Sequence, residues 1–273
     1  MVYYLAMADD KAFTGSIPKI YETYLVPLIF VPYAEDIATR LAARAPARVL
    51  EVAAGTGVVT RAMAAALPAS SEIVATDLNP AMLEEAAALG TSRPVEFKQA
   101  DAMQLGFPDQ SFDAVVCQFG VMFFPDKVKA YGEFRRVLKP GGVLIFNVWD
   151  RLEANEFADA ITSALAAFFP EDPPRFLPRA PYGYFDHATI AADVAAAGFT
   201  SPPAFDTIPS RSRAKSAVEP AVGYCQGSPL RAEIDARGPL EQATDAAAKE
   251  IEKRFGSGPV DALIQAHVVT VER

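Results

Sequence analysis

The chain has 273 residues, of which 51% are hydrophobic and 22% are charged, and its formal net charge is −9. This composition suits a folded protein with a sizeable core and argues against global disorder. The acidic balance, without a run of Lys or Arg, disfavours an RNA or DNA partner. With two cysteines and two histidines, neither a disulfide framework nor a zinc or other metal site is expected.

The N-terminal sequence and the longest apolar segment argue against membrane targeting. Residues 1–11 (MVYYLAMADDK) lack the basic region of a signal peptide. The apolar segment 24–34 contains Pro27 and Pro32 and is shorter than the roughly 20 residues that span a bilayer. We therefore expect a cytoplasmic protein without stable membrane insertion.

Strands and helices alternate in the first half of the chain. The sequence predicts five strands, at 48–53, 72–77, 95–101, 112–119 and 143–149. Helical spacing and capping residues predict helices at 35–45, about 58–66, 81–89 and 126–138, the last followed by a stop and turn at 139–142. This alternation indicates βαβ units and a parallel sheet.

After Trp149 the pattern changes. The predicted elements are a helix (153–168), a proline- and aromatic-rich lid or loop (170–186), a helix (187–199), a strand (204–208), several short helices (212–264) and a last strand (266–272). The predicted fold class is α/β, a Rossmann-like doubly wound sheet that is mostly parallel, with an antiparallel strand near the C-terminus and a helical cap. We expect a single structural unit with an N-terminal helical lid (1–45), a cofactor-binding core (46–150) and the remaining sheet with substrate-cap insertions (151–273).

The stretch VLEVAAGTGVVT (49–60) joins a strand to a helix through a glycine loop. Gly55 and Gly57 fit the start of a dinucleotide-binding pattern, but Thr60 stands where the third glycine is expected. Glu51 lies within the strand, where its carboxylate would repel a pyrophosphate but could pair with a cation. The alternative is an acid at the end of a strand near solvent.

Two further acids follow later strands. Asp77 ends the second strand, where it could bind ribose hydroxyls or cap the next helix. Asp101 ends the third strand, where it could read a base edge beside Ala102 or be an ordinary loop acid. Because ligands bind outside the carboxyl ends of parallel strands, these acids, the glycine loop and Gln118–Phe119 are expected to converge on one crevice.

Four ordered motifs, VLEVAAGTG, ATDLNPAMLEEA, QADAMQLGFPDQSFDAVVCQFGVMFF and EFRRVLKPGG, resemble a class I S-adenosylmethionine-dependent methyltransferase over about residues 45–150. More narrowly, they resemble the methyltransferase type 11 group with its ubiquinone/menaquinone-biosynthesis enzymes. The resemblance implies S-adenosyl-L-methionine as cofactor, S-adenosyl-L-homocysteine as product and a small-molecule methyl acceptor. The aromatic- and proline-rich stretch 168–185 and the apolar residues after the fourth strand suggest that this acceptor is partly apolar. This cofactor carries a sulfonium and an ammonium but no phosphate, so an acid beside the loop would favour its binding.

The resemblance also assigns cofactor contacts. Glu51 and Gly55–Gly57 would lie along the methionine part, Asp77 would bind the ribose, Leu78 would pack on the adenine, and Asp101 would accept from the adenine amino group. The full set of expected contacts is Glu51, Ala53, Gly55, Thr56, Gly57, Asp77, Leu78, Met82, Asp101, Ala102, Gln118, Phe119, Tyr21 and Tyr24.

Other roles are left open by the sequence. Gln118 and Phe119 would line the side near the transferred methyl, whereas Tyr21 and Tyr24 suit either a cofactor lid or core packing. His187 is the one weak candidate for a general base, or a surface residue at a helix N-terminus.

The competing functions are a nicotinamide-dependent oxidoreductase and a non-catalytic, S-adenosylmethionine-binding regulatory protein. The acceptor, the choice of O-, C- or N-methylation, and the oligomeric state, with a homodimer as one option, stay open.

Overall fold

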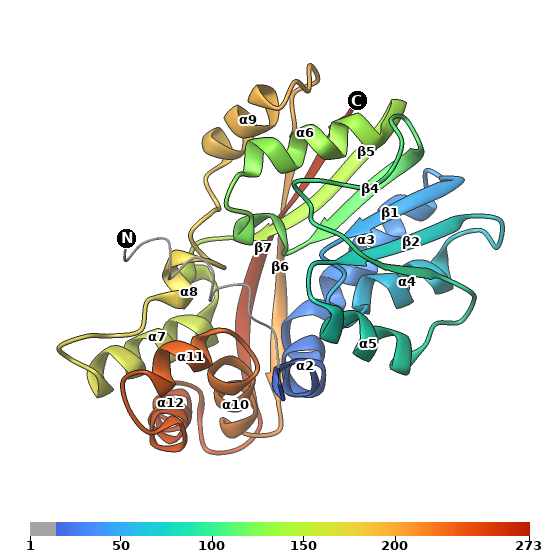
Figure 1. Cartoon of the computed structure of the whole chain (residues 1–273). Coiled ribbons are helices and arrows are strands. Elements are labelled where there is room, and N and C mark those ends of the chain that lie inside the picture. The colour runs from blue at the N-terminus through green and yellow to red at the C-terminus, as the bar shows by residue number, and fades with distance from the viewer. Residues whose placement is uncertain (1–14) are drawn as a thin grey trace. The chain divides into compact units, whose positions relative to one another are not determined.

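The computed structural model describes residues 15–273 (Figure 1). These residues form two compact units. The first, here the helical unit, contains the described residues up to Phe30 together with Trp149–Gly183 and Pro209–Ala266. The second, here the sheet unit, contains Val31–Val148, Tyr184–Ile208 and His267–Arg273. The predicted division at residues 45 and 150 stays a prediction, and the part of its first segment before residue 15 lies outside the described residues.

Seven strands form one sheet in the order β3-β2-β1-β4-β5-β7-β6. They are β1 (Arg48–Val52), β2 (Glu72–Asp77), β3 (Glu96–Gln99), β4 (Phe112–Gln118), β5 (Leu138–Trp149), β6 (Ala204–Ala214) and β7 (Val260–Glu272). The pairs among β1–β5 are parallel. Strand β7 is antiparallel to β5, because Gly141 N donates to Arg273 O at one end and Asp150 N donates to Gln265 O at the other. The predicted Rossmann-like sheet with an antiparallel strand near the C-terminus is confirmed.

Helices occupy the connections between the strands. The α-helices of the sheet unit are α3 (Val31–Ala42), α4 (Val58–Ala66), α5 (Pro80–Leu89), α6 (Lys127–Val137) and α9 (His187–Ala196). Those of the helical unit are α2 (Ile17–Ile20), α7 (Glu156–Phe168), α8 (Phe176–Arg179), α10 (Val218–Gln226), α11 (Leu230–Asp235) and α12 (Leu240–Phe255), with a π-helix, η1 (Tyr21–Phe30). Two short 3₁₀-helices, η2 (Val121–Phe123) and η3 (Leu152–Ala154), follow β4 and β5.

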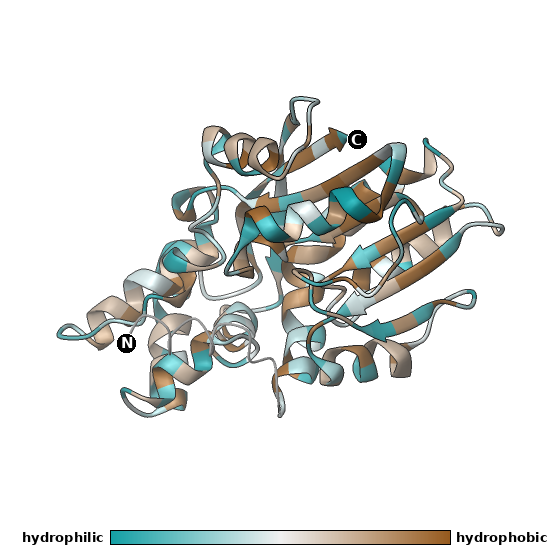
Figure 2. Ribbon diagram, turned by 45° about the horizontal axis from the view of Figure 1, so that its top comes forward, coloured by the Kyte–Doolittle hydropathy of each residue, from teal (hydrophilic) through white to brown (hydrophobic). Residues whose placement is uncertain are grey.

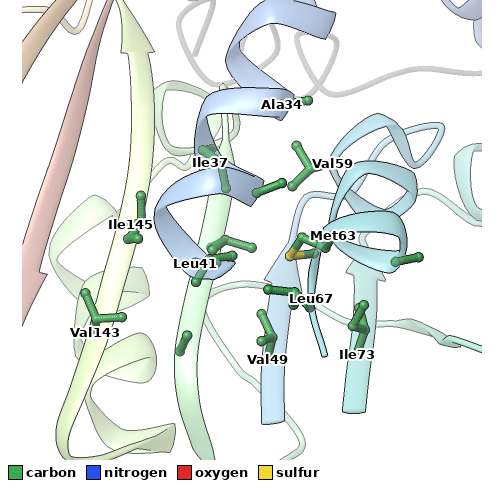
Figure 3. Close-up of a cluster of buried hydrophobic side chains, with 14 of the residues drawn as sticks. Ala34, Ile37, Leu41, Val49, Val59, Met63, Leu67, Ile73, Val143 and Ile145 are labelled. Atoms are coloured by element: carbon green, nitrogen blue, oxygen red, sulfur yellow. The ribbon is translucent and has the colours of Figure 1, made fainter. Parts of the chain in front are cut away.

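The inner strands of the sheet are buried on both faces, as the apolar runs of β4 and β5 predict, and these strands are largely hydrophobic in Figure 2. The edge strands β3 and β6 are mostly exposed. On one face, Ile37 and Leu41 of α3 and Met63 of α4 pack with apolar residues of β1, β2, β4 and β5 (Figure 3). On the other face, Tyr131 of α6 packs on Phe146 of β5, with ring centroids 5.3 Å apart. The parallel sheet is therefore held between helices, which leaves the carboxyl ends of its strands as the edge where ligands bind in such folds.

The apolar segment 24–34 is helical through both of its prolines. Pro27 lies inside η1, and Pro32 is the second residue of α3, which follows η1 directly. A proline is tolerated at this position of an α-helix, and π-helical turns accommodate departures from the regular hydrogen-bond pattern. Within residues 15–273, no helix is both long enough and apolar enough to cross a membrane.

The predicted turn at 139–142 is wrong in detail. Helix α6 ends at Val137 and β5 begins at Leu138. Leu138 pairs with Phe112 and Val143 pairs with Ala114, so the residues between them form a bulge within the strand. A side chain at Gly142 would approach the carbonyl oxygens of Asp113 and Lys139 to 2.9 Å, which explains the glycine. Strands β6 and β7 are also longer than the predicted 204–208 and 266–272, since β6 continues through polar residues to Ala214 and β7 begins at Val260.

Candidate functional site

The predicted site residues of the sheet unit gather where four neighbouring parallel strands end. The loops after β1, β2, β3 and β4 carry them, and these four strands are adjacent in the sheet. The residues concerned are Glu51, Ala53, Gly55, Thr56, Gly57, Asp77, Leu78, Met82, Asp101, Ala102, Gln118 and Phe119. Met82 lies in the first turn of α5 with its side chain buried. The expected convergence on one edge is thus present in the backbone arrangement.

The glycine loop turns sharply between β1 and α4. Ala53, Gly55 and Gly57 all have positive φ, of 56°, 56° and 85°, which is routine for glycine and costly for alanine. Gly57 N donates to Ala54 O at 2.9 Å, and a side chain at Gly57 would lie 3.1 Å from the Cβ of Ala86 on α5. This close packing aims the N-terminus of α4 at the site, where its amide groups favour anionic ligand groups such as carboxylates.

Glu51 is a buried acid beneath this loop. The residue is only 1% exposed, and its Oε2 accepts a hydrogen bond from the Thr60 hydroxyl at 2.5 Å. Burial raises the pKa of Glu51 from its ordinary value to about 8, although the Thr60 bond works in the opposite direction. The alternative of an acid near solvent is therefore wrong. Thr60, which occupies the position of the third glycine, supplies the hydroxyl partner of the carboxyl.

Asp77 connects the end of β2 to the glycine loop. Its Oδ2 accepts from Gly55 N and its Oδ1 from Asn79 N, each at 2.8 Å. Burial raises the pKa of Asp77, and these two backbone bonds oppose the shift. A carboxylate offers about four lone-pair positions, so acceptor capacity remains for ligand hydroxyls. The next residue, Leu78, exposes 42% of its surface, which is unusual for a large apolar side chain in this protein.

Asp101 lies two residues beyond the end of β3, not at the end of that strand as predicted. Its Oδ1 accepts from Met103 N at 2.8 Å, which closes a tight turn, and Ala102 beside it is buried. The prediction failed by these two residues because the polar sequence around Asp101 gives no sharp end to the strand. Asp101 itself is half-buried, so its carboxylate is accessible to a ligand.

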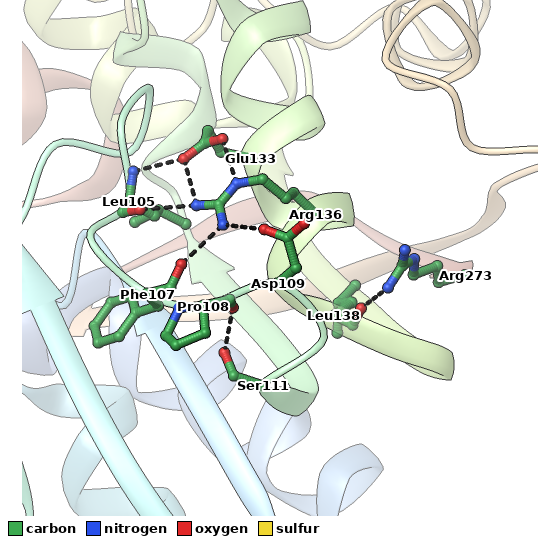
Figure 4. A network of polar contacts seen from close by, with 9 residues as sticks. All are labelled: Leu105, Phe107, Pro108, Asp109, Ser111, Glu133, Arg136, Leu138 and Arg273. Carbon is green, nitrogen blue, oxygen red and sulfur yellow. Dashed lines mark hydrogen bonds and ion pairs between the residues drawn. The ribbon is translucent and has the colours of Figure 1, made fainter.

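Arg136 on α6 anchors the loop that follows Asp101 (Figure 4). Its guanidinium donates to the carbonyls of Leu105 and Phe107 at 2.8 Å and to the carboxylates of Glu133 and Asp109 at 2.7 to 2.9 Å. Glu133 in turn accepts from Leu105 N at 2.7 Å. Arg136 is not among the residues predicted from the sequence. The one sequence feature that could have pointed to it is its place within the EFRRVLKPGG motif.

The loop after β4 is positioned by Asn147 of β5, a second residue that the sequence analysis missed. Asn147 is fully buried, and its Oδ1 accepts from Phe119 N at 2.9 Å while its amide donates to Gln118 Oε1 at 3.4 Å. Phe119 has a positive φ of 50°, and a side chain at Gly120 would approach the Cβ of Ala53 to 2.6 Å. The loops after β1 and β4 therefore touch, and only glycine fits between them.

Another predicted residue of the sheet unit, His187, lies elsewhere in that unit. His187 is the first residue of α9, where Asp186 caps the helix by accepting from Thr189 N at 2.8 Å. Its ring stacks on Phe205 of β6 with centroids 4.2 Å apart, on the side of the sheet order away from β1. The structure thus does not bring His187 to the site, and its role as a base stays a prediction.

Tyr21 and Tyr24 belong to η1 of the helical unit, and Tyr21 stacks on Phe30 there with centroids 5.1 Å apart. Their role as a cofactor lid also stays a prediction.

No cluster of three or more His, Cys, Asp or Glu side chains that could hold a metal ion occurs among residues 15–273.

Comparison with known proteins identifies the core of the chain. Residues 50–146 match the family described as a methyltransferase domain. This segment is a methyltransferase domain. The resemblance drawn from the four motifs is confirmed, and with it the S-adenosylmethionine-dependent type of the domain.

The methyltransferase domain has curated relatives with known names. Demethylmenaquinone methyltransferase of Thermus thermophilus is 43% identical over 104 residues, which cover 37% of this chain and 47% of that protein. The ubiquinone/menaquinone biosynthesis C-methyltransferase UbiE of Pseudomonas savastanoi is 37% identical over 127 residues, 45% of this chain and 50% of the relative. The chain thus spans about half the length of these relatives. The YcgJ protein of Bacillus subtilis shares the fold, with a TM-score of 0.56 at 19% identity over 89% of this chain and 98% of that one.

Proposed function

We propose that this protein is an S-adenosylmethionine-dependent methyltransferase that acts on a small, partly apolar molecule. The observation that carries the proposal is Glu51, a buried carboxyl whose pKa is raised to about 8 beside the glycine loop. A pyrophosphate at this loop would gain no attraction from this acid, because a nearby anion disfavours ionisation of the carboxyl still further. A ligand with an ammonium and a sulfonium would instead stabilise the carboxylate that burial disfavours.

The surrounding residues support the same ligand. Asp77 is held by two backbone amides and has acceptor capacity left for the two ribose hydroxyls. Leu78 offers an exposed apolar surface on which the adenine ring would pack. Asp101 would accept from the adenine amino group, and Gln118 with Phe119 would line the methionine side near the transferred methyl group.

The bound cofactor would supply an activated methyl group. That methyl group would pass from the sulfur to the acceptor's nucleophilic atom, with loss of the carbon–sulfur bond and of a proton from the acceptor to water, while Glu51, Asp77 and Asp101 would hold the cofactor. The protein's contribution is to hold the two reactants in line and to exclude water.

The names of the relatives narrow the acceptors to be tested first. They describe methylation of demethylmenaquinone and C-methylation in ubiquinone and menaquinone biosynthesis. A quinol ring with an apolar side chain combines a nucleophilic carbon with a partly apolar body. We infer that such a ring is the acceptor class most worth assaying for this chain.

Isothermal titration with S-adenosylhomocysteine tests cofactor binding. Binding is expected for the natural chain, and Asp77→Asn should weaken it at least about ten-fold because a charge-assisted hydrogen bond is lost. The matched control is Asp245→Asn, an exposed acid on α12. Absence of binding at millimolar ligand, together with binding of a nicotinamide dinucleotide, would favour the oxidoreductase alternative.

A second experiment separates an enzyme from a regulatory binder. The chain is incubated with methyl-labelled S-adenosylmethionine and either a quinol or a metabolite extract, and labelled product is sought. Label transfer that requires Asp77 supports the enzyme. Tight cofactor binding without transfer to any acceptor would favour the non-catalytic alternative.

A further inference from the structure

The helical unit contains a pocket to which none of the site residues of the sheet unit contributes. Its volume is about 680 Å³, within the range of roughly 300–1,000 Å³ that small-molecule sites occupy. One wall is the π-helix η1, and the others are the end of β6, the start of α10 and the residue before β7. The lining residues are Thr23, Tyr24, Pro27, Leu28, Arg213, Ala214, Lys215, Glu219 and Pro259.

Two glycines fix the walls of the pocket against each other. A side chain at Gly223 of α10 would lie 3.2 Å from Leu25 and 3.3 Å from the Cβ of Tyr24 on η1. A side chain at Gly227, about one turn later, would lie 3.2 Å from the backbone nitrogen of Tyr21. Because both positions lack a side chain, α10 packs directly on the backbone of η1. The pocket is therefore bounded by close-packed helices, as preformed ligand sites are.

The helix that forms the first wall is itself unusual. Segment η1 continues as a π-helix for ten residues with Pro27 inside it. Such helices are rare and mostly limited to single turns, and they are frequent at functional sites. Pro27 lines the pocket, so the irregular part of the helix faces the cavity. A π-helix costs free energy relative to an α-helix, and a role in shaping a binding site would account for its presence.

The polar groups of the pocket favour an anion. Within residues 15–273, neither the Lys215 ammonium nor the Tyr24 hydroxyl has a side-chain partner. Arg213 is paired with Asp261 at 3.0 Å, and Glu219 accepts from the backbone nitrogen of Lys215 at 2.9 Å. Lys215 is thus the cation at the rim without a matching acid of its own.

A buried hydroxyl next to the pocket also lacks a partner. Ser212 is fully buried, and its Oγ has no hydrogen bond within the described part of the chain. It lies two residues before Ala214 on β6, and residues two apart point to the same face of a strand. Ala214 lines the pocket. The Ser212 hydroxyl is thus a buried hydrogen-bonding group close in sequence to the pocket lining that the described residues leave unsatisfied.

We propose that this pocket binds a small organic anion, a carboxylate or phenolate on an apolar body. Lys215 and Tyr24 hold the charged head, and Leu28, Pro27 and Ala214 surround the apolar part. The assignment uses only residues of the helical unit. Because Tyr24 is also a predicted cofactor-lid residue, Lys215→Gln is the variant that tests this pocket separately from the cofactor site.

The test compares 4-phenylbutyrate with its neutral amide by isothermal titration. The anion should bind about five-fold more tightly than the amide, a preference expected from one exposed ion pair, and added salt should reduce it. Lys215→Gln should abolish the preference, and Tyr24→Phe should weaken binding of the anion. The matched control is Lys249→Gln, an exposed lysine on α12 of the same unit, which should keep the preference unchanged.

Three results would overturn the proposal. These are equal affinity for the anion and the amide, absence of binding at millimolar ligand, and an equal effect of Lys215→Gln and Lys249→Gln. Thermal unfolding of each variant checks that it folds. Titration of the same samples with S-adenosylhomocysteine distinguishes failure of this site from failure of the proposed function.

Discussion

Replacing Glu51 by Gln would remove an ionisable group from the interior while keeping its shape. The amide oxygen of glutamine can still accept the hydrogen bond that Thr60 donates in the natural chain. The variant therefore separates the effect of charge from the effects of packing and hydrogen bonding. Its consequences follow from the raised pKa of the buried carboxyl.

The magnitude follows from proton linkage. Burial raises the pKa of Glu51 from about 4.5 to about 8 in the folded chain. Between these values the folded state binds more protons than the unfolded state, so the free energy of unfolding falls as pH rises. The full difference corresponds to roughly 5 kcal/mol, of which roughly 3 kcal/mol is lost between pH 5 and pH 7. Glu51→Gln, which carries no charge, should lack this loss.

Urea denaturation from pH 5 to pH 9 measures the effect. The natural chain and Glu51→Gln should have similar free energies of unfolding at pH 5, and the variant should be several kcal/mol more stable at pH 8. The same variant should bind S-adenosylhomocysteine more weakly. Glu84→Gln, which changes an exposed acid on α5, should follow the natural profile. Parallel profiles for the natural chain and Glu51→Gln would refute the reasoning.

Three other substitutions test how the site is held together. Gly120→Ala forces a methyl group against Ala53 and should lower the free energy of unfolding by about 1–3 kcal/mol, measured by urea denaturation, while weakening S-adenosylhomocysteine binding. Arg136→Ala should cost about 2 kcal/mol and Arg135→Ala clearly less, because only Arg136 holds the loop; equal losses would contradict this. His187→Ala should cost about 1 kcal/mol of ring packing and leave S-adenosylhomocysteine affinity unchanged by titration; a large loss of affinity would place His187 near the cofactor after all.

The sequence predicted the parts of the fold that depend on neighbouring residues. Apolar runs located the parallel strands β1, β2, β4 and β5, because a strand buried on both faces is apolar along its length. The acids at the strand ends were also visible, since Glu51 and Asp77 interrupt or end such runs. What escaped prediction depends on tertiary contacts, as with the bulge at 139–142, which exists because β5 must pair with β4 at both ends.

Three further residues of the site were not predicted for the same physical reason. Asn147 holds Phe119 across 28 positions of sequence, and nothing local to either residue signals the bond. Arg136 reaches carbonyl groups about 30 residues earlier in the chain. Thr60 was noticed only as an absent glycine, because its bond to Glu51 depends on how α4 turns over β1. The continuation of η1 into α3 was missed for a local reason, since Pro27 in η1 and Pro32 in α3 both favour an interruption of the helix.

The proposed cofactor site depends most directly on a contact between the ligand ammonium and the Glu51 carboxyl. Titration of the natural chain with S-adenosylhomocysteine at pH 7, repeated in buffers of different ionisation enthalpy, measures both binding and the protons exchanged. We predict binding with release of close to one proton, because the ligand ammonium would convert a carboxyl with a pKa of about 8 to its ionised form. Absence of binding at millimolar ligand, or binding without proton release, would contradict this account.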